Sequence, residues 1–307
     1  MNVAVVGAGA LGTLFAGRLA AAGTDVTLVG RPGGHVEAIQ RDGIEISGVD
    51  PIRGIEVEAT TDHDAVAGSS WLLLAVKSYD TAEAMASVGD ALASGPIVTV
   101  QNGLGNAETI ADFVAPQRVV VGTTSHGATL DRPGVVDHAG RGDTVLGRYF
   151  GEADASDVRV ETVAATLSRA GIETTVTDRP RDALWEKVIV NVAINAATAL
   201  ARVPNGHLVR YGPGKRLLER AAREALAVAR AEGRSIDESV VDRARAVART
   251  TASNRSSMRR DVESGSRTEI ESLNGAVVSL AEEHDVSTPV NRTLADLVRL
   301  TRAGADD

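Results

Sequence analysis

The sequence predicts an α/β domain built on a doubly wound parallel sheet over residues 1–177, followed by an all-helical domain over residues 178–307. In the first part, short apolar segments of strand length alternate with helical segments, which is typical of a parallel sheet with helices on both faces. From Asp178 onward, Ala-rich segments of helical pattern follow one another without strand-like alternation. A chain of 307 residues is long enough for two such domains.

The first element is a strand that leads directly into a glycine-rich turn. Residues 2–6 are apolar, Gly7-Ala8-Gly9-Ala10-Leu11-Gly12 follows at once, and residues 13–22 have the pattern of a helix. Glycines at this spacing between a strand and a helix form the fingerprint of a Rossmann-type dinucleotide site. Gly7 permits the tight turn, Gly9 lets the backbone approach a pyrophosphate, and Gly12 lets the helix pack closely on the strand. We therefore predict that these six residues bind a dinucleotide.

The second strand, residues 25–29, ends at Gly30-Arg31. At this distance from the fingerprint, an NAD site usually presents Asp or Glu to the ribose hydroxyls, whereas an arginine suits the 2′-phosphate of NADP. The sequence has no carboxylate at this position, so it predicts NADP(H) as the coenzyme. The alternative is that Arg31 is an ordinary surface residue of the following loop.

Two further polar residues follow predicted central strands. Lys77 comes after the apolar residues 70–76, and Asn102 comes after residues 97–100. In open parallel sheets, ligands bind outside the carboxyl ends of the strands, so both residues are predicted to line the coenzyme site. The Asn-Gly pair that begins at Asn102 is also typical of a tight turn. The sheet is expected to be completed by a helix at 158–170 and strands at 119–124, 134–138, 144–146 and 173–176.

Lys187 is the first candidate for proton chemistry. The chain contains only three lysines, Lys77, Lys187 and Lys215, and the other 29 of its 32 basic residues are arginines. A lysine amine can be tuned to release its proton, whereas an arginine guanidinium cannot. In the helix predicted over 180–201, Lys187, Asn191, Asn195 and Thr198 fall within roughly 80° of arc on one face. We interpret this stripe as facing a ligand, with hydrogen bonding inside a helical core as the alternative.

Further polar candidates lie in or between the remaining helices. Asn254 and Ser257 are one helical turn apart, and Asn205 follows the first long helix, where a simple turn is the alternative role. Ser266 and Glu269 have the spacing of a capping box, which by itself would explain Glu269. The remaining helices are predicted over residues 214–233, 237–262, 267–285 and 291–302.

The composition excludes several classes of site. The chain has no cysteine, which rules out disulfides and cysteine nucleophiles, and its six scattered histidines lack metal-ligand spacing, so we predict no metal. His126 lies near the predicted hydride site, but Lys187 is the stronger candidate for the acid. A net charge of −9 without a basic cluster argues against nucleic acid as a partner. Without a leader or a stretch of about 20 apolar residues, we expect a soluble, cytoplasmic protein outside the membrane.

Several motifs follow one another along the chain: Val76-Lys77, Gln101-Asn102-Gly103, Leu184-Trp185-Glu186-Lys187 with Asn191 and Asn195, Pro204-Asn205-Gly206, Ser256-Ser257-Met258 with Asp261, and Thr268-Glu269-Ile270 through Asn274-Gly275. Together with the fingerprint, they resemble the ketopantoate reductase (2-dehydropantoate 2-reductase) family over nearly the whole chain. The resemblance implies NADPH-dependent reduction of ketopantoate to pantoate, a step of pantothenate and coenzyme A biosynthesis.

The same resemblance implies roles for individual residues. In that family, the lysine matching Lys187 is the proton donor and the glutamate matching Glu269 lies in the active site, so both are predicted to be catalytic. Substrate contacts are implied for Asn102, Lys187, Asn191, Asn195, Asn205, Asn254 and Ser257. Coenzyme contacts beyond the fingerprint are implied for Arg31, Lys77, Asn102, Ala128 and Glu269.

The resulting hypothesis is a hydride transfer from NADPH to the carbonyl carbon of a 2-oxo acid. Lys187 would stabilise the negative charge that grows on the carbonyl oxygen and then donate the proton. Two alternatives remain: a related NADP-dependent hydroxyacid dehydrogenase that acts on another 2-oxo acid, and a nicotinamide-sensing protein without turnover. The expected partner is a small 2-oxo acid, and the sequence is compatible with a homodimer.

Overall fold

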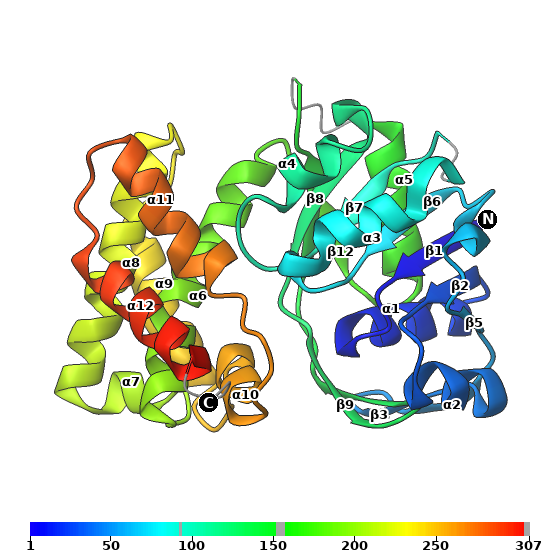
Figure 1. The fold of residues 1–307 in the computed structure, drawn as a ribbon, viewed down its shortest axis with the longest axis horizontal. Helices are drawn as coiled ribbons and strands as arrows, with labels where there is room; N and C mark the ends of the chain where they lie inside the picture. Colours follow the sequence, from blue (N-terminus) through cyan, green and yellow to red (C-terminus); the bar gives the residue numbers. More distant parts are fainter. Residues whose placement is uncertain (92–93, 152–156, 304–307) are drawn as a thin grey trace. The chain divides into compact units, whose positions relative to one another are not determined.

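The computed structural model describes residues 1–91, 94–151 and 157–303 (Figure 1). The chain forms two compact units. The first consists of Met1–Gln101 and Asn106–Pro180, and the second consists of Arg181–Asp307 together with the short segment Asn102–Gly105. Residues 92–93, 152–156 and 304–307, which the two predicted domains include, lie outside the described residues.

The first unit is built on an eight-stranded sheet with the strand order β12-β11-β8-β7-β6-β1-β2-β5. All neighbouring strands run parallel except β8 and β11, which are antiparallel. The strands are β1 (Asn2–Val6), β2 (Asp25–Val29), β5 (Glu58–Thr60), β6 (Trp71–Leu74), β7 (Ile97–Thr99), β8 (Val119–Thr124), β11 (Thr144–Arg148) and β12 (Thr174–Val176). A parallel-dominated sheet of the predicted kind is thereby confirmed.

Apolar residues cover both faces of this sheet. Successive side chains of a strand point to opposite faces, and β1 divides accordingly: Val3 and Val5 belong to one buried cluster, whereas Ala4 and Val6 belong to another. A strand that is buried on both faces reads as a continuous apolar run, which is why the central strands could be predicted. The helices of this unit are α1 (Ala10–Ala21), α2 (Gly34–Asp42), α3 (Thr81–Val88), α4 (Asn106–Ala111) and α5 (Val158–Arg169).

A second, four-stranded sheet in the same unit has the order β4-β3-β10-β9. Its strands are β3 (Ile44–Gly48), β4 (Ile52–Ile55), β9 (Gly127–Arg132) and β10 (Val135–Gly140). The prediction that residues 134–138 extend the main sheet was therefore wrong, because β10 pairs with β3 and β9 instead. An alternating pattern indicates a strand but does not specify the strand with which it pairs.

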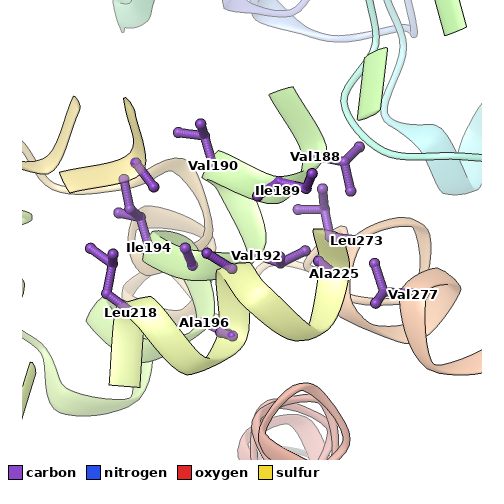
Figure 2. Packing of buried hydrophobic residues seen from close by; sticks show 14 of the residues in the cluster. Val188, Ile189, Val190, Val192, Ile194, Ala196, Leu218, Ala225, Leu273 and Val277 are labelled. Carbon is purple, nitrogen blue, oxygen red and sulfur yellow. The ribbon is translucent and has the colours of Figure 1, made fainter. Parts of the chain in front are cut away.

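All regular elements in the described part of the second unit are helices. The helices are α6 (Pro180–Ala201), α7 (His207–Arg210), α8 (Gly212–Ala231), α9 (Ser239–Thr250), α10 (Ser257–Glu263), the π-helix η5 (Glu271–Gly275), α11 (Ala276–Glu283) and α12 (Pro289–Ala303). Apolar side chains of α6, α8, η5 and α11 form one buried cluster (Figure 2). Val192, Ala225, Leu273 and Val277 are members of it, one from each of these helices.

Two of the predicted helices differ from the structure. The helix predicted over 237–262 is interrupted at residues 251–256, where Ser256 accepts a hydrogen bond from the backbone N–H of Arg259 and caps α10. The helix predicted over 267–285 begins only at Glu271, with a π-helical turn that has no side-chain cap. The capping box of Ser266 and Glu269 was therefore a wrong prediction, since neither residue lies at the start of that helix.

Helix α6 is long and apolar enough, by length and composition, to cross a membrane. In the structure, 67% of its most apolar 18-residue window is buried inside the protein. A mostly buried helix of this kind is typical of the core of a globular unit, and α6 contributes a large share of the apolar cluster in the second unit. The apolar composition of α6 is thus explained by its packing inside the second unit.

Candidate active site

The glycine-rich turn after β1 has the geometry that its sequence predicts. Gly7 adopts a φ of 113°, and a Cβ at this position would lie 2.7 Å from backbone atoms of Ala75 and Val76. A Cβ at Gly12 would lie 1.9 Å from the carbonyl oxygen of Gly7, so only glycine fits there. A Cβ at Gly9 would meet no atom within 4 Å. The backbone at Gly9 is therefore open to the approach of a ligand.

The start of α1 suits an anion. No side chain caps this helix, so its first backbone N–H groups are available to a phosphate, which the helix N-terminus favours electrostatically. Ala8, Ala10 and Leu11 of the turn are partly buried against the apolar cluster on one face of the sheet. These residues fit the pyrophosphate of a dinucleotide.

The turns that follow β1, β2 and β6 meet at the carboxyl ends of these strands. The N–H of Ala75 donates to the carbonyl oxygen of Val6 over 2.8 Å, and a Cβ at Gly30 would lie 2.6 Å from the Cβ of Ala8. Arg31 directly follows Gly30, and Lys77 lies two residues after Ala75. The structure thus brings the fingerprint, Arg31 and Lys77 to one edge of the sheet, where the order of strands reverses on either side of β1.

Arg31 is not alone at this edge. Its side chain is 88% exposed, and its Nη2 lies 3.9 Å from Oδ2 of Asp80, a residue of the 3₁₀ turn η2 (Ser78–Asp80). The sequence has no carboxylate at the Arg31 position, but the fold brings one close to it from the turn after a different strand.

Ala128 lies in β9, opposite His138 of β10, and packs against the same apolar cluster as Ala8 and Leu11. His126, just before it, pairs through Nδ1 with Nε2 of His138 at 3.0 Å. Burial and the nearby His138 and Arg18 lower the pKa of His126 to about 4. With this pKa, His126 is almost entirely in its neutral form near neutral pH and lacks the acidic imidazolium proton, which argues against His126 as the acid.

Asn102 belongs to the second unit, as do the three residues after it. The N–H of Leu104 donates to the carbonyl oxygen of Ser272 over 2.8 Å, and the Nδ2 of Asn102 donates to Oε2 of Glu269 over 3.4 Å. Gly103 has a φ of 89°, and a Cβ there would collide with Ser272. The Asn-Gly pair therefore forms a turn and also brings a side-chain amide to Glu269.

Lys187 lies on α6 with Asn191 and Asn195 on the same helical face. Burial lowers the pKa of Lys187 to about 8, while the Glu269 carboxylate opposes this change and raises it. Such an amine is still mostly protonated at neutral pH and can release its proton readily. Among the described residues, no hydrogen bond involves the side-chain amides of Asn191 and Asn195, which leaves both free for a ligand.

Thr198 differs from the rest of this stripe. It is fully buried, its hydroxyl donates to the Ile194 carbonyl oxygen over 2.8 Å, and its Oγ1 lies 2.8 Å from Oγ of Ser256. These contacts account for Thr198 within the core, as the alternative interpretation of the stripe proposed. They also hold the turn before α10 against α6.

Asn205 is 7% exposed and lies beside this same turn. Its N–H donates to the carbonyl oxygen of Asn254 over 3.0 Å, and its Nδ2 donates to Oγ1 of Thr251 over 2.9 Å. Since the Thr251 hydroxyl donates to Val247, it must accept from Asn205, and this fixes the orientation of the amide. The Oδ1 of Asn205 is then a buried acceptor without a partner among the described residues.

The predicted substrate residues around this turn differ in exposure. Ser257 is the first residue of α10 and is partly buried, whereas the Asn254 side chain is exposed. The structure therefore brings α6, Asn205 and the turn at 251–256 together in one unit. Glu269, which is 7% exposed, belongs to the same unit and acts on Lys187 through its charge.

The sequence analysis assigned no role to the residues that hold these groups in place, although Ser256 and Asn274 belong to the motifs quoted above. Ser256 and Ser272 make the contacts described above, and Asn274 and Asn291 are fully buried. The available signal was weak: a polar residue inside an apolar helical pattern can face either a ligand or a second buried polar group. In the part of the chain that the structure describes, no three His, Asp or Glu side chains come together as a metal site.

Two family models cover most of the chain. The model described as ketopantoate reductase PanE/ApbA matches residues 3–151, and the model of its C-terminal part matches residues 180–302. Curated relatives match over nearly their full length. A 2-dehydropantoate 2-reductase of Halobacterium salinarum is 52% identical over 98% of this chain and 99% of its own. A protein of the same name from Pyrococcus horikoshii is 36% identical over 97% of both chains.

Solved structures agree with the fold. A PanE/ApbA family ketopantoate reductase from Ralstonia eutropha superposes with a TM-score of 0.92 at 35% identity, and the match covers all of both chains. D-Mandelate dehydrogenase in complex with NADH and anilino(oxo)acetate superposes with a TM-score of 0.91 over all of both chains. At 22% identity, this second likeness concerns the fold alone.

Proposed function

Because the chain belongs to the ketopantoate reductase PanE/ApbA family, we propose that it reduces ketopantoate to pantoate with NADPH, in pantothenate and coenzyme A biosynthesis in the cytoplasm. Relatives that carry the name 2-dehydropantoate 2-reductase support this reaction, because they match this chain over nearly their whole length. The main structural support is Lys187, an amine with a pKa lowered to about 8 beside an acidic side chain.

The first unit is the proposed coenzyme-binding domain. The open backbone at Gly9 and the uncapped start of α1 suit the pyrophosphate, and Arg31, with Lys77 at the same edge, suits the 2′-phosphate of NADP. Ala128, which packs against the apolar cluster beside the fingerprint, would contact the coenzyme as well. When bound, NADPH supplies the hydride that reduces the carbonyl carbon.

The second unit is the proposed catalytic and substrate domain. As the carbonyl carbon is reduced, negative charge develops on its oxygen; the Lys187 ammonium would stabilise this charge and then donate the proton. Glu269 would keep that amine protonated, since its charge raises the pKa of Lys187. Loss of a positioned proton donor typically lowers turnover by about 10²- to 10⁴-fold.

The amides around Lys187 are the proposed substrate ligands. Asn191 and Asn195 lie on the face of α6 that carries Lys187, and the unpartnered Oδ1 of Asn205 would accept a hydrogen bond from a substrate hydroxyl. Ser257 and Asn254 border the same turn. Asn102 would contact both ligands, as the family resemblance implies, and its amide also bonds Glu269.

The test compares Lys187→Ala with Lys215→Ala, an exposed lysine on α8 in the same unit. NADPH absorbance is followed with ketopantoate and with a panel of smaller and bulkier 2-oxo acids. We expect Lys187→Ala to lose at least about 100-fold in kcat while its Kd for NADPH changes little. Lys215→Ala should behave as wild type. Near-normal turnover by Lys187→Ala would remove this residue from the proposed role, and a preference for another 2-oxo acid would replace ketopantoate.

A further inference from the structure

A buried polar network links the segment that carries Glu269 to the helix that carries Lys187. Asn274 of η5 and Asn291 of α12 are both fully buried in the second unit. The Nδ2 of Asn274 donates to Oδ1 of Asn291 over 3.0 Å and to the carbonyl oxygen of Val192 over 3.4 Å. Val192 lies on α6, so one side chain connects η5 with two other helices.

The far end of the network is anchored on α8. The Nδ2 of Asn291 donates to the carbonyl oxygen of Ala221 over 3.0 Å and to Oε2 of Glu224 over 2.9 Å. The backbone N–H groups of Val290 and Asn291 also donate to the Glu224 carboxylate. The start of α12 is therefore fixed to α8, and Asn274 is linked to α8 through Asn291.

These contacts determine the orientation of the Asn274 amide. The Asn291 amide must direct its nitrogen to Ala221 and Glu224, which leaves its oxygen to accept from Asn274. The Oδ1 of Asn274 is consequently buried without a partner among the described residues. A buried polar atom without a partner opposes folding, whereas the two hydrogen bonds that Nδ2 donates favour it. The Asn274 amide therefore satisfies acceptors on α6 and α12 and leaves its own oxygen unpaired.

The turn that contains Asn274 is π-helical. The N–H of Gly275 donates to the carbonyl oxygen of Ile270, five residues earlier, over 2.9 Å, and a Cβ at Gly275 would lie 3.2 Å from that oxygen. Single π-helical turns inside α-helices are rare and are frequent at functional sites. Glu269 directly precedes this turn.

The π-helical turn also carries the contacts of Glu269. The Ser272 hydroxyl donates to the carbonyl oxygen of Glu269 over 3.1 Å, and the Ser272 carbonyl oxygen accepts from Leu104 over 2.8 Å. If the turn relaxed to an α-helix, the preceding residues would rotate by about 100° and advance by about 1.5 Å along the axis. Glu269 and its contact with Asn102 would then be displaced from Lys187.

We propose that Asn274 is a positioning residue: anchored by Asn291 and Glu224, it bonds α6 at Val192 and holds the π-helical turn in the register that sets Glu269 relative to Lys187. This inference rests on the proposed function of Lys187 and Glu269. Asn274 itself touches neither the reacting atoms nor, through any described contact, the Lys187 amine. It acts on the amine through the Glu269 carboxylate.

The test combines a structural and a kinetic readout on the full chain. Crystals of Asn274→Ala should lack the Gly275–Ile270 hydrogen bond and show Glu269 displaced from Asn102. In the same variant, kcat should fall by about 10- to 100-fold, the range typical when an outer-shell partner of a functional group is lost. The loss of activity on the alkaline side should begin at lower pH than in wild type, because less of the Glu269 attraction reaches Lys187.

Val240→Ala, a buried truncation on α9 of the same unit, is the matched control. This variant should lower the melting temperature, as a merely structural loss would. It should not change the pH at which activity begins to fall on the alkaline side of the profile, here called the alkaline limb. In a Glu269→Gln background, Asn274→Ala should shift the limb no further, because the charge through which it acts is gone. An unchanged limb in Asn274→Ala, or an intact π-helical turn in its crystals, would overturn the proposal.

Failure of the proposed function would look different. If Lys187→Ala retained both turnover and the alkaline limb, Lys187 would not be the titrating acid, whatever Asn274→Ala does. The crystal structure of Asn274→Ala would still decide whether this amide holds the turn. If the variant proved insoluble, Asn274→Ser, which keeps a small hydrogen-bonding group, would serve in its place with the same expected direction.

Discussion

The Nη2 of Arg31 and the Oδ2 of Asp80 lie 3.9 Å apart at the carboxyl edge of the main sheet. The two residues follow different strands, β2 and β6, so the approach of their charges depends on the parallel pairing of both strands with β1. An arginine beside a carboxylate is partly neutralised as a site for a 2′-phosphate. Because Arg31 is 88% exposed, the pair is weak, on the order of 0.2 to 1 kcal/mol.

Replacement of Asp80 should therefore favour the phosphorylated coenzyme. In Asp80→Asn, we expect the KM for NADPH to fall by at most about fivefold, with little change for NADH, because an ion pair of this strength is worth a factor of that size. Arg31→Ala should raise the KM for NADPH about tenfold or more and leave NADH nearly unaffected. The measurement is the KM for both coenzymes in each variant. Equal effects on both would show that neither side chain senses the 2′-phosphate.

The pH dependence of reduction should follow Lys187. Its pKa is about 8, and the protonated form is the acid, so kcat/KM should be level below pH 8 and fall by about tenfold per pH unit above it. Glu269 raises this pKa; Glu269→Gln should therefore move the descending limb to lower pH. A limb that moves to higher pH, or does not move, would contradict this assignment. The profile is measured at saturating NADPH.

Lys187 should also reduce the stability of the folded protein. Its pKa falls from 10.5 in the unfolded chain to about 8 in the folded protein, and this balance already includes the attraction of Glu269. The buried charge therefore opposes folding by at most about 3 kcal/mol below pH 8, and the penalty fades as pH rises from 8 to 10.5. We expect Lys187→Met to raise the melting temperature at pH 7 by several degrees and less at pH 10. A lower melting temperature of Lys187→Met at pH 7 would refute the prediction that the buried charge opposes folding.

Gly9 and Gly12 offer a matched pair for the coenzyme site. A methyl group at Gly9 enters open space, whereas one at Gly12 would lie 1.9 Å from the Gly7 carbonyl oxygen. Gly9→Ala should keep its melting temperature while the Kd for NADPH rises about tenfold or more, because the methyl group would occupy the approach of the pyrophosphate. Gly12→Ala should lose both stability and binding. Unchanged NADPH affinity in Gly9→Ala, measured by fluorescence titration, would argue against this location.

The elements that could be predicted are those whose formation is indicated by the residue pattern within a single segment of the chain. Residues 3–6 of β1 and all of β6 are continuous apolar runs because they are buried on both faces, and α6 ends where its apolar pattern does. The pairing of β10 with β3 is different: it joins residues about ninety positions apart, and no local pattern encodes it. The same is true of Asp80, which reaches Arg31 from another turn.

Within the candidate site, the sequence identified the groups but not their support. Lys187, Asn191 and Asn195 share a helical face that periodicity reveals, whereas Glu269 was explained equally well by a capping box. The carboxylate instead contacts Asn102, because the helix begins two residues later with a π-helical turn. A register of this kind depends on tertiary contacts such as that of Asn274 with Val192, which helix propensity cannot reveal.

The segment Asn102–Gly105 has a consequence for how the protein can be divided. It belongs to the second unit although the chain on both sides of it belongs to the first, so the polypeptide enters the second unit twice. A single protease cut near residue 180 would not release an intact C-terminal fragment, and a truncated chain that ends there would leave Leu104 without the carbonyl group of Ser272. Separate expression of the two halves should therefore yield pieces that require each other to fold completely.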